Sequence, residues 1–146
     1  MTLESFRDGP FLTAALICER VLDEKDNVKS VVRIVDRVNH QVVGPDPPME
    51  MPPVRGYRLA MLIQFKSGRA RGAHNLKLRL LKPSGETARL AEQMVMFEGE
   101  DDRGVDVVAN LVADFEYAGV YWIEVMLNDT HVTRVPLRVV YLPQKR

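Results

Sequence analysis

The sequence has one cysteine, three histidines and no long apolar run, and each scarcity excludes a class of protein. Cys18 has no second cysteine with which to form an intramolecular disulfide or a multi-cysteine zinc site. Charged residues interrupt every hydrophobic stretch before it reaches the roughly 18 apolar residues of a membrane-spanning helix. Residues Met1 to Pro10 lack the basic start and long apolar segment of a secretory signal. We therefore expect a cytoplasmic protein without a membrane partner.

The common catalytic signatures are also missing. No Gly-x-Ser-x-Gly elbow, Walker loop or dinucleotide fingerprint occurs. His40, His74 and His131 lie in different segments, without the spacing of a zinc enzyme. Cys18 sits on an apolar segment with only Arg20 as a nearby basic group, which is typical of a small buried side chain. The sequence therefore predicts a protein that is not an enzyme and has no cofactor.

The net charge is zero, but the charges are segregated along the chain. Residues 51–85 contain eight basic and no acidic groups, whereas residues 86–129 contain eleven acidic and two basic groups. We expect the two blocks to lie side by side and their exposed charges to pair. A weaker hypothesis is anion binding by the basic block. Its candidate residues are Arg69, Arg71, Lys77 and Arg79. The neutral total and the lack of interleaved aromatic residues argue against a nucleic-acid partner.

Apolar residues recur at every second position along most of the chain, which is the period of a half-buried β-strand. In Val105–Phe115, for example, Val107 and Leu111 fall on one face, and Asp106 and Asn110 on the other. We predict an all-β fold, a two-sheet antiparallel β-sandwich of about eight strands, as one domain over residues 1–146. The eight segments are Phe11–Glu19, Lys29–Val42, Tyr57–Lys66, Asn75–Lys82, Leu90–Phe97, Val105–Phe115, Val120–Leu127 and His131–Leu142.

Three segments are less regular. Phe11 to Leu22 is apolar on both faces, so a helix competes with the favoured strand. In Lys29–Val42 the alternation points Asp36 inward, and we expect a bulge to turn this carboxylate outward. The proline-rich segment 44–56 has five prolines over residues 44–53, and this stretch cannot join a central ladder. We expect it to be a crossover loop, with a proline-rich recognition segment as the alternative.

The last two strands predict their own register. If Ile123 and Val135 both face the core, a three-residue loop over 128–130 pairs them and places Leu127 opposite His131. The outer face then pairs Glu124 with Arg134, an opposite-charge pair that was not used to choose the register. The same register places Trp122 by Pro136 and Met126 by Val132. Pro136 also implies an edge position or a bulge.

The spacing of Gly119, Tyr121 and Ile123 resembles the tyrosine corner of immunoglobulin-like sandwiches. A wider resemblance rests on Leu16–Val21, Val31–Val38 and the final Gly-x-Tyr strand with its partner. These segments resemble a family of small bacterial proteins known only as a domain of unknown function. Members of that family often have Gly-Lys after the first turn, whereas this chain has Asn27-Val28-Lys29. The resemblance implies a bacterial, cytoplasmic protein and no catalytic residue.

Two binding hypotheses follow. The first is a protein-interaction or self-assembly module, a homo-oligomer for example, that uses the apolar and basic outer face of the C-terminal hairpin. Its residues are Trp122, Met126, Val132, Arg134, Pro136 and Arg138. The alternative is a small-ligand or calcium-binding domain that uses the acidic loop 98–106. Its residues are Glu98, Glu100, Asp101 and Asp102.

Overall fold

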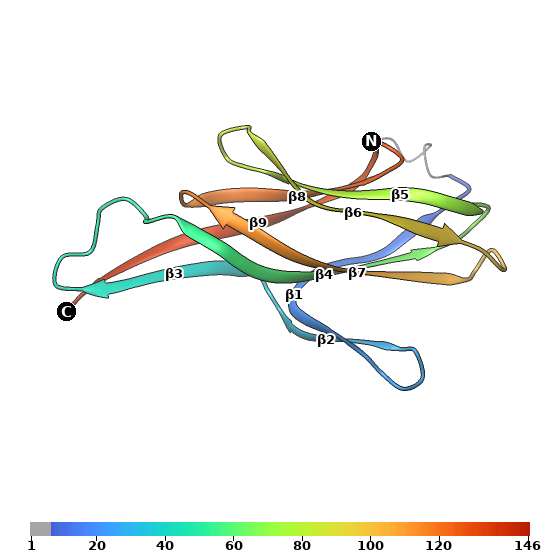
Figure 1. Ribbon diagram of the computed structural model, residues 1–146, viewed down its shortest axis with the longest axis horizontal. Helices are drawn as coiled ribbons and strands as arrows, with labels where there is room; N and C mark the ends of the chain where they lie inside the picture. The colour runs from blue at the N-terminus through green and yellow to red at the C-terminus, as the bar shows by residue number, and fades with distance from the viewer. Residues whose placement is uncertain (1–6) are drawn as a thin grey trace.

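The computed structural model describes residues 7–146, and every regular element in this range is a β-strand (Figure 1). The strands are β1 (Phe11–Asp23), β2 (Lys29–Ile34), β3 (Arg37–Gly44), β4 (Val54–Lys66), β5 (Gly72–Leu81), β6 (Thr87–Phe97), β7 (Gly104–Phe115), β8 (Gly119–Leu127) and β9 (Thr130–Lys145). They form a four-stranded sheet A, in the order β2-β1-β4-β7, and a five-stranded sheet B, in the order β3-β9-β8-β5-β6. The all-β, two-sheet prediction is confirmed.

Within residues 7–146 there is no helix long and apolar enough to cross a membrane. The signal-peptide prediction for Met1 to Pro10 falls largely on residues outside this range.

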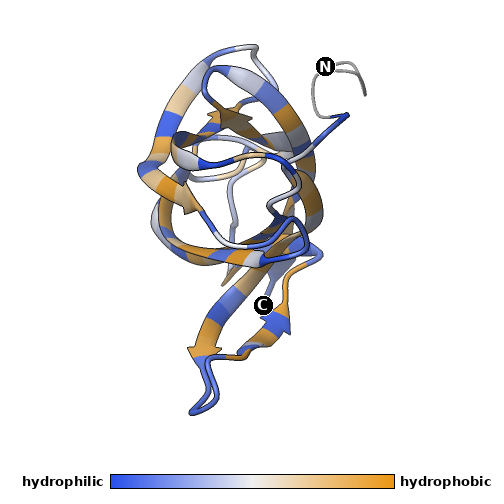
Figure 2. Cartoon of the chain, turned by 90° about the vertical axis from the view of Figure 1, so that its right-hand side faces the viewer, coloured by the Kyte–Doolittle hydropathy of each residue, from blue (hydrophilic) through white to orange (hydrophobic). Residues whose placement is uncertain are grey.

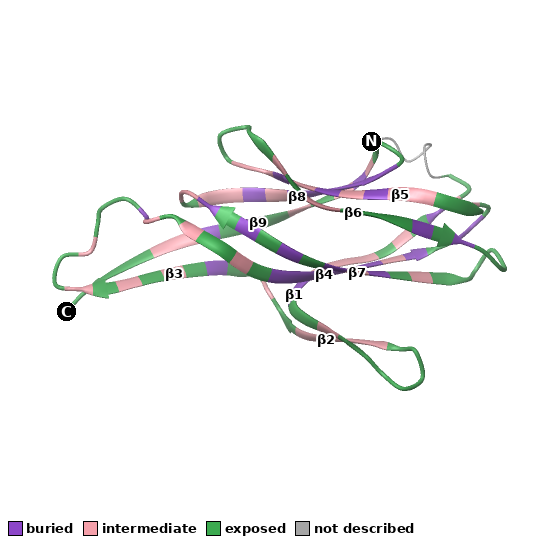
Figure 3. Ribbon diagram, viewed as in Figure 1, coloured by how far each residue is buried: buried purple, intermediate pink, exposed green. Residues whose placement is uncertain are grey.

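The core lies between the two sheets and is built from hydrophobic residues (Figure 2). Alternate residues of β5 and β7 are buried, whereas residues 59–63 of β4 and 123–127 of β8 are buried without a break (Figure 3). Sheet B is strongly curled, and its edge strand β6 is in contact with edge strand β7 of sheet A. Aromatic pairs join the sheets. Phe65 of β4 meets Phe97 of β6 edge-on, with ring centroids 5.7 Å apart. Phe115 of β7 meets Tyr121 of β8 in the same way at 4.9 Å. These two contacts connect the inward faces of sheet A and sheet B within the apolar core.

The segment Lys29–Val42 forms two strands, not one. β2 ends in sheet A at Ile34, the chain bends at Asp36, and β3 begins in sheet B at Arg37. Arg33 has a left-handed φ of 55°. Because the strand breaks here, Asp36 is exposed without the predicted bulge, and the count rises from eight strands to nine. β3 then pairs with β9 in parallel, so the antiparallel prediction is wrong for this pair.

The segment Phe11–Leu22 is a strand, as favoured over the helix. β1 pairs with β4 as far as Cys18 and with β2 from Cys18 onwards. The far half of β1 and β2 therefore form a hairpin that projects from the two sheets (Figure 1).

Residues 45–53 of the proline-rich segment run from β3 in sheet B to β4 in sheet A. Two contacts hold this stretch. The Tyr141 hydroxyl donates a hydrogen bond to the Pro48 carbonyl at 2.6 Å, and Met51 is buried in the core. The stretch thus packs beside the end of β9.

The predicted register of β8 and β9 is confirmed through Val125, which pairs with Thr133. A bulge follows, after which Met126 pairs with His131 and Leu127 with Thr130. The three-residue loop was therefore the wrong prediction. Only two residues, Asn128 and Asp129, form the turn, with φ values of 50° and 64°. Positive φ at both positions is the type I′ geometry, whose twist matches that of the flanking strands.

Pro136 was predicted to lie at an edge or a bulge. β3 pairs with β9 only from Arg138 onwards, so at Pro136 strand β9 has β8 on one side alone. Proline is tolerated at such a local edge because no neighbour needs its missing N–H.

Candidate binding surface on sheet B

The outer face of β5, β8 and β9 surrounds a buried carboxylate. Glu124 of β8 is only 7% exposed, although its side chain points away from the core. Arg79 is its register partner on β5, and Arg79 Nε donates a hydrogen bond to Glu124 Oε1 at 2.8 Å. His131 Nε2 lies 3.1 Å from Glu124 Oε2. A carboxylate buried to this degree requires such partners.

Two opposing effects act on the Glu124 carboxyl. Burial raises its pKa, whereas the hydrogen bonds and charges of Arg79 and His131 lower it. The partners outweigh burial, so the pKa of Glu124 lies below its ordinary value. Glu124 is therefore ionised at neutral pH and is already neutralised by Arg79.

Arg134 is oriented differently from the prediction. It lies opposite Glu124 in the register, as predicted, but its guanidinium carbon stacks over the Trp122 ring, 4.4 Å from the ring centroid. Within residues 7–146, Arg134 makes no ion pair. Stacking uses the face of the guanidinium and leaves the N–H groups at its edge free for a ligand.

A hollow of about 430 Å³ opens beside this cation–π pair. It is lined by Glu124, His131, Thr133 and Arg134. Because Arg79 compensates Glu124, the positive charge that has no partner at this hollow, among the residues that the structure describes, belongs to Arg134. The arrangement can hold an acidic group against Arg134 with a planar or apolar neighbour against Trp122.

The predicted partner-binding residues are only partly available. Trp122 is half-buried, and Arg134, Pro136 and Arg138 are exposed. Met126 and Val132, in contrast, are 6% and 5% exposed, and Val132 packs in the core. Val132 lies at the bulge, which reverses the face to which its side chain points. The apolar stripe is therefore shorter than predicted, and the surface is more basic.

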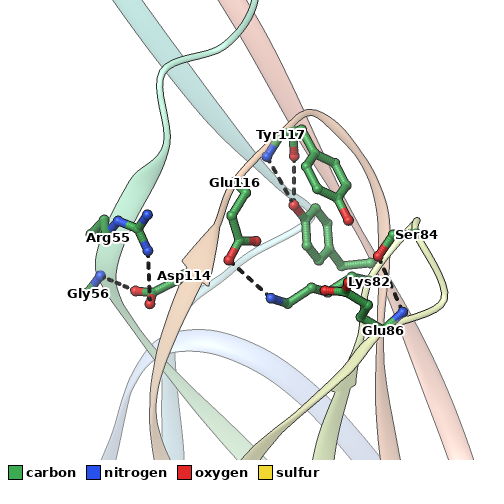
Figure 4. A network of polar contacts seen from close by, with 9 residues as sticks. Arg55, Gly56, Lys82, Ser84, Glu86, Asp114, Glu116 and Tyr117 are labelled. Atoms are coloured by element: carbon green, nitrogen blue, oxygen red, sulfur yellow. Dashed lines mark hydrogen bonds and ion pairs between the residues drawn. The ribbon is translucent and has the colours of Figure 1, made fainter.

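The segregated charge blocks pair as predicted. Five ion pairs connect residues 51–85 with residues 86–129. They are Arg55–Asp114, Arg71–Asp101, Lys77–Asp129, Arg79–Glu124 and Lys82–Glu116. The Lys82–Glu116 pair lies near the β7–β8 connection (Figure 4), with a nitrogen–oxygen distance of 3.0 Å. The hydrogen bond that Lys82 donates to the Glu116 carboxylate lowers the pKa of Glu116.

These ion pairs separate the four residues that were predicted to bind an anion. Arg69 and Arg71 lie beside the loops at one end of the molecule, and Arg71 holds Asp101 at 2.8 Å. Lys77 and Arg79 lie along β5, and each faces a carboxylate. The four residues do not converge on one anion.

The acidic loop does not form a cluster of ligands either. Among the described residues, no group of three or more histidine, cysteine, aspartate or glutamate side chains is placed to hold a metal ion. Asp101 is directed to Arg71, and Asp101 and Asp102 line a mixed-charge hollow with Lys66 and Arg69. The geometry gives the calcium hypothesis no support.

Two residues of the surface were missed by sequence reasoning. Arg79 was assigned to anion binding and His131 to the core face of the hairpin, whereas both hold Glu124. The pairing of β5 with β8 that places Arg79 is long-range, and no local pattern reports it. For His131, the pair Asn128-Asp129 was a usable signal, because both residues tolerate positive φ in a two-residue turn.

The fold and this surface define an all-β domain of two packed sheets with a charged outer face. The chain belongs to the Family of unknown function (DUF6941), which matches residues 13–140. The predicted resemblance to an uncharacterised family is thereby confirmed. Among curated proteins, none matches.

One similar solved structure is that of the Pseudomonas fluorescens alkylpurine DNA glycosylase AlkC bound to DNA containing an abasic site analog. The two are 9% identical with a TM-score of 0.43, and the match covers 86% of this chain and 30% of that one. A likeness at this level supports no inference about fold or function.

Proposed function

We propose that this domain is a non-enzymatic protein-interaction module that binds an acidic segment of a partner protein on the outer face of sheet B. The observation that carries the proposal is Arg134, which is stacked on Trp122 and has no carboxylate partner among residues 7–146. Stacking restricts the guanidinium before binding, so less entropy is lost when a carboxylate docks. Arginine and tryptophan are also the residues that most often dominate protein interfaces.

The surrounding charges favour an acidic partner. Glu124 is neutralised by Arg79, and Arg138 adds a second exposed positive charge two residues beyond Pro136 on the same face. The hollow beside Arg134 has room for a carboxylate side chain. A lysine-rich partner would instead meet uncompensated positive charge.

Trp122 is the single tryptophan of the chain and serves as the probe. A short peptide that alternates glutamate and threonine is titrated against the protein at low salt, with a glutamine–threonine peptide as control. We expect the acidic peptide to change Trp122 fluorescence with saturation. Arg134→Gln should weaken binding at least about tenfold, since a charge-assisted hydrogen bond is lost.

Arg58→Gln is the matched control, because Arg58 is an exposed arginine of sheet A. It should leave the titration unchanged. No saturable response to the acidic peptide, or equal losses in Arg134→Gln and Arg58→Gln, would refute an acidic site at Arg134.

Two finer assignments belong to this proposal. An immunoglobulin-like relationship is supported by Tyr121, whose hydroxyl donates a hydrogen bond to the Tyr117 carbonyl at 2.7 Å. A cytoplasmic location in a bacterium is supported by the family resemblance and by Cys18, a buried free thiol. Neither assignment adds a residue to the site.

A further inference from the structure

The hollow beside Arg134 has a second nitrogen-bearing side chain, the imidazole of His131. The ring lines the hollow, its side chain is 43% exposed, and Nε2 lies 3.1 Å from Glu124 Oε2. The bulge between Val125 and Met126 turns this side chain to the outer face of sheet B. A titratable side chain therefore borders the site proposed for an acidic segment.

The contact with Glu124 decides where His131 can take up a proton. The Glu124 carboxylate is ionised at neutral pH, so it accepts hydrogen bonds and donates none. In a neutral ring, Nε2 of His131 must therefore carry the hydrogen, and Nδ1 carries the free electron pair. Among residues 7–146, Nδ1 has no hydrogen-bond partner. Protonation at Nδ1 keeps the contact with Glu124, adds a positive charge and supplies a new N–H donor.

The other two histidines are placed differently. His74 Nδ1 lies 2.6 Å from the side-chain amide of Asn128, and its Nε2 lies 3.2 Å from the Arg71 carbonyl oxygen. His40 lies on β3, with its ring centroid 6.3 Å from that of Tyr141. Of the three histidines, all within the part of the chain that the structure describes, His131 is the one that lines the hollow.

The charges around His131 are paired, except that of Arg134. On the same outer face lie Glu124 of β8, Arg79 and Lys77 of β5, Arg134 of β9 and Asp129 of the turn. The ion pairs are Arg79–Glu124, Lys77–Asp129 and, on β6, Arg89–Glu92. Within residues 7–146, one positive charge at the hollow is thus left without a partner. A proton on His131 raises that charge from one to two.

We propose that His131 takes up a proton from solvent when the acidic segment binds, so that the segment binds more tightly at mildly acidic than at mildly alkaline pH. The site is that of the proposed function, on which this proposal rests, and the proton adds its regulation. Arg134 and protonated His131 would both offer charged N–H donors to a carboxylate in the hollow. Histidine ordinarily changes its charge between about pH 5 and 8, whereas a lysine or arginine here would hold the second charge permanently.

Proton uptake and segment binding are linked in both directions. If the proton strengthens binding of the segment by some factor, the bound segment must strengthen binding of the proton by the same factor. The first effect is a change in the dissociation constant of the segment. The second is a change in the pH at which the His131 ring titrates, so the two can be measured independently.

The first experiment measures binding at two pH values. The glutamate–threonine peptide is titrated against the protein at low salt, at about pH 5.5 and at about pH 8, with Trp122 fluorescence as the signal. Glutamates of a flexible peptide titrate near pH 4.3, at about their ordinary pKa, so they stay ionised in both solutions. We expect the dissociation constant to be about threefold lower at the acidic pH, which is the effect of one unit charge several ångströms away near water.

Three variants assign the effect to His131. His131→Gln keeps an N–H donor for Glu124 but takes up no proton, so it should bind equally at both pH values, with the weaker affinity. His131→Lys is charged in both solutions, so it should bind equally at both, with the tighter affinity. His40→Gln is the matched control and should keep the pH dependence of the unmodified chain. Circular dichroism confirms that each variant is folded.

The second experiment follows the His131 ring directly. Proton NMR of the imidazole C–H signals, assigned by comparison with His131→Gln, gives the pH midpoint of His131 titration with and without saturating peptide. The acidic peptide should raise this midpoint by about half a pH unit, which is the threefold change in affinity expressed as proton binding. The glutamine–threonine peptide should leave the midpoint unchanged.

Three results would overturn this proposal and leave the acidic site standing. They are equal dissociation constants at the two pH values, a pH dependence that persists in His131→Gln, and a His131 midpoint that the acidic peptide does not move. Absence of saturable binding at either pH would refute the acidic site itself, and this proposal with it.

Discussion

Arg79, on β5, holds the Glu124 carboxylate at 2.8 Å, although the sequence pairs Glu124 with Arg134 across the β8–β9 hairpin. Glu124 lies between two arginines, one on each neighbouring strand. Only one of them binds it, and the other stacks on Trp122. Arg79 therefore stabilises the buried carboxylate, and Arg134 is left available for binding.

Arg79→Met should therefore destabilise the protein more than Arg134→Met. Removing Arg79 leaves a buried carboxylate with His131 alone, which should lower the free energy of unfolding by about 2–3 kcal/mol. Removing Arg134 costs a partly exposed cation–π contact, worth about 1 kcal/mol or less. Urea denaturation of both variants measures the difference. Equal losses would show that Arg134 also supports Glu124.

Glu124 should make stability depend on acid pH. Its pKa is lower in the folded than in the unfolded state, so its stabilisation is complete above the unfolded value of about 4.3 and is lost as pH falls through the folded value. In Glu124→Gln, the urea midpoint should fall less steeply below pH 5. Glu100→Gln, in an exposed loop, is the control and should keep the steep dependence. A steep dependence in Glu124→Gln would contradict the assignment.

Gly68→Ala should be strongly destabilising. Gly68 has a φ of 57°, and an added Cβ would lie 2.5 Å from the Asp8 carbonyl oxygen and 2.9 Å from Gly9 Cα. Backbone atoms cannot move aside cheaply, so we expect a loss of at least about 2 kcal/mol. Gly44→Ala is the control, because nothing lies within 4 Å of its added Cβ. Thermal unfolding of both variants tests this, and comparable melting temperatures would refute the close approach.

Cys18 should be unreactive in the folded protein. Its side chain is fully buried, and burial raises the pKa of its thiol, which disfavours the thiolate. We expect a disulfide reagent such as dithiobisnitrobenzoate to modify Cys18 at least about a hundredfold more slowly in buffer than in urea, because reaction requires opening of the sheet. Similar rates in both solvents would show that sheet A opens readily around Cys18.

The alternation of apolar residues was sufficient to predict nearly every strand. Val105–Phe115 alternates along its whole length and matches β7 within one residue. A period of two reports a half-buried strand directly, because side chains alternate between faces. The same signal failed between Ile34 and Arg37, where the chain changes sheet, because a single turn-forming residue, Asp36, marks that bend between two apolar runs.

Only part of the candidate site could be predicted from the periodicity of the sequence. The Trp122–Pro136 and Glu124–Arg134 pairs follow from one hairpin, whose register is local. Val132 was placed on the wrong face because one bulge reverses a side chain. The two apolar faces of β1 were visible in the sequence, but only the strand order shows that its neighbours in sheet A are β2 and β4.

By itself, the sequence determined the all-β class, the register of the final hairpin up to Val125 and the pairing of a basic with an acidic block. Each follows from local periodicity or from the charge of neighbouring segments. Only the tertiary structure decided which arginine binds Glu124 and that β3 runs parallel to β9. These depend on which distant strands become neighbours, and that is set by packing of the whole core.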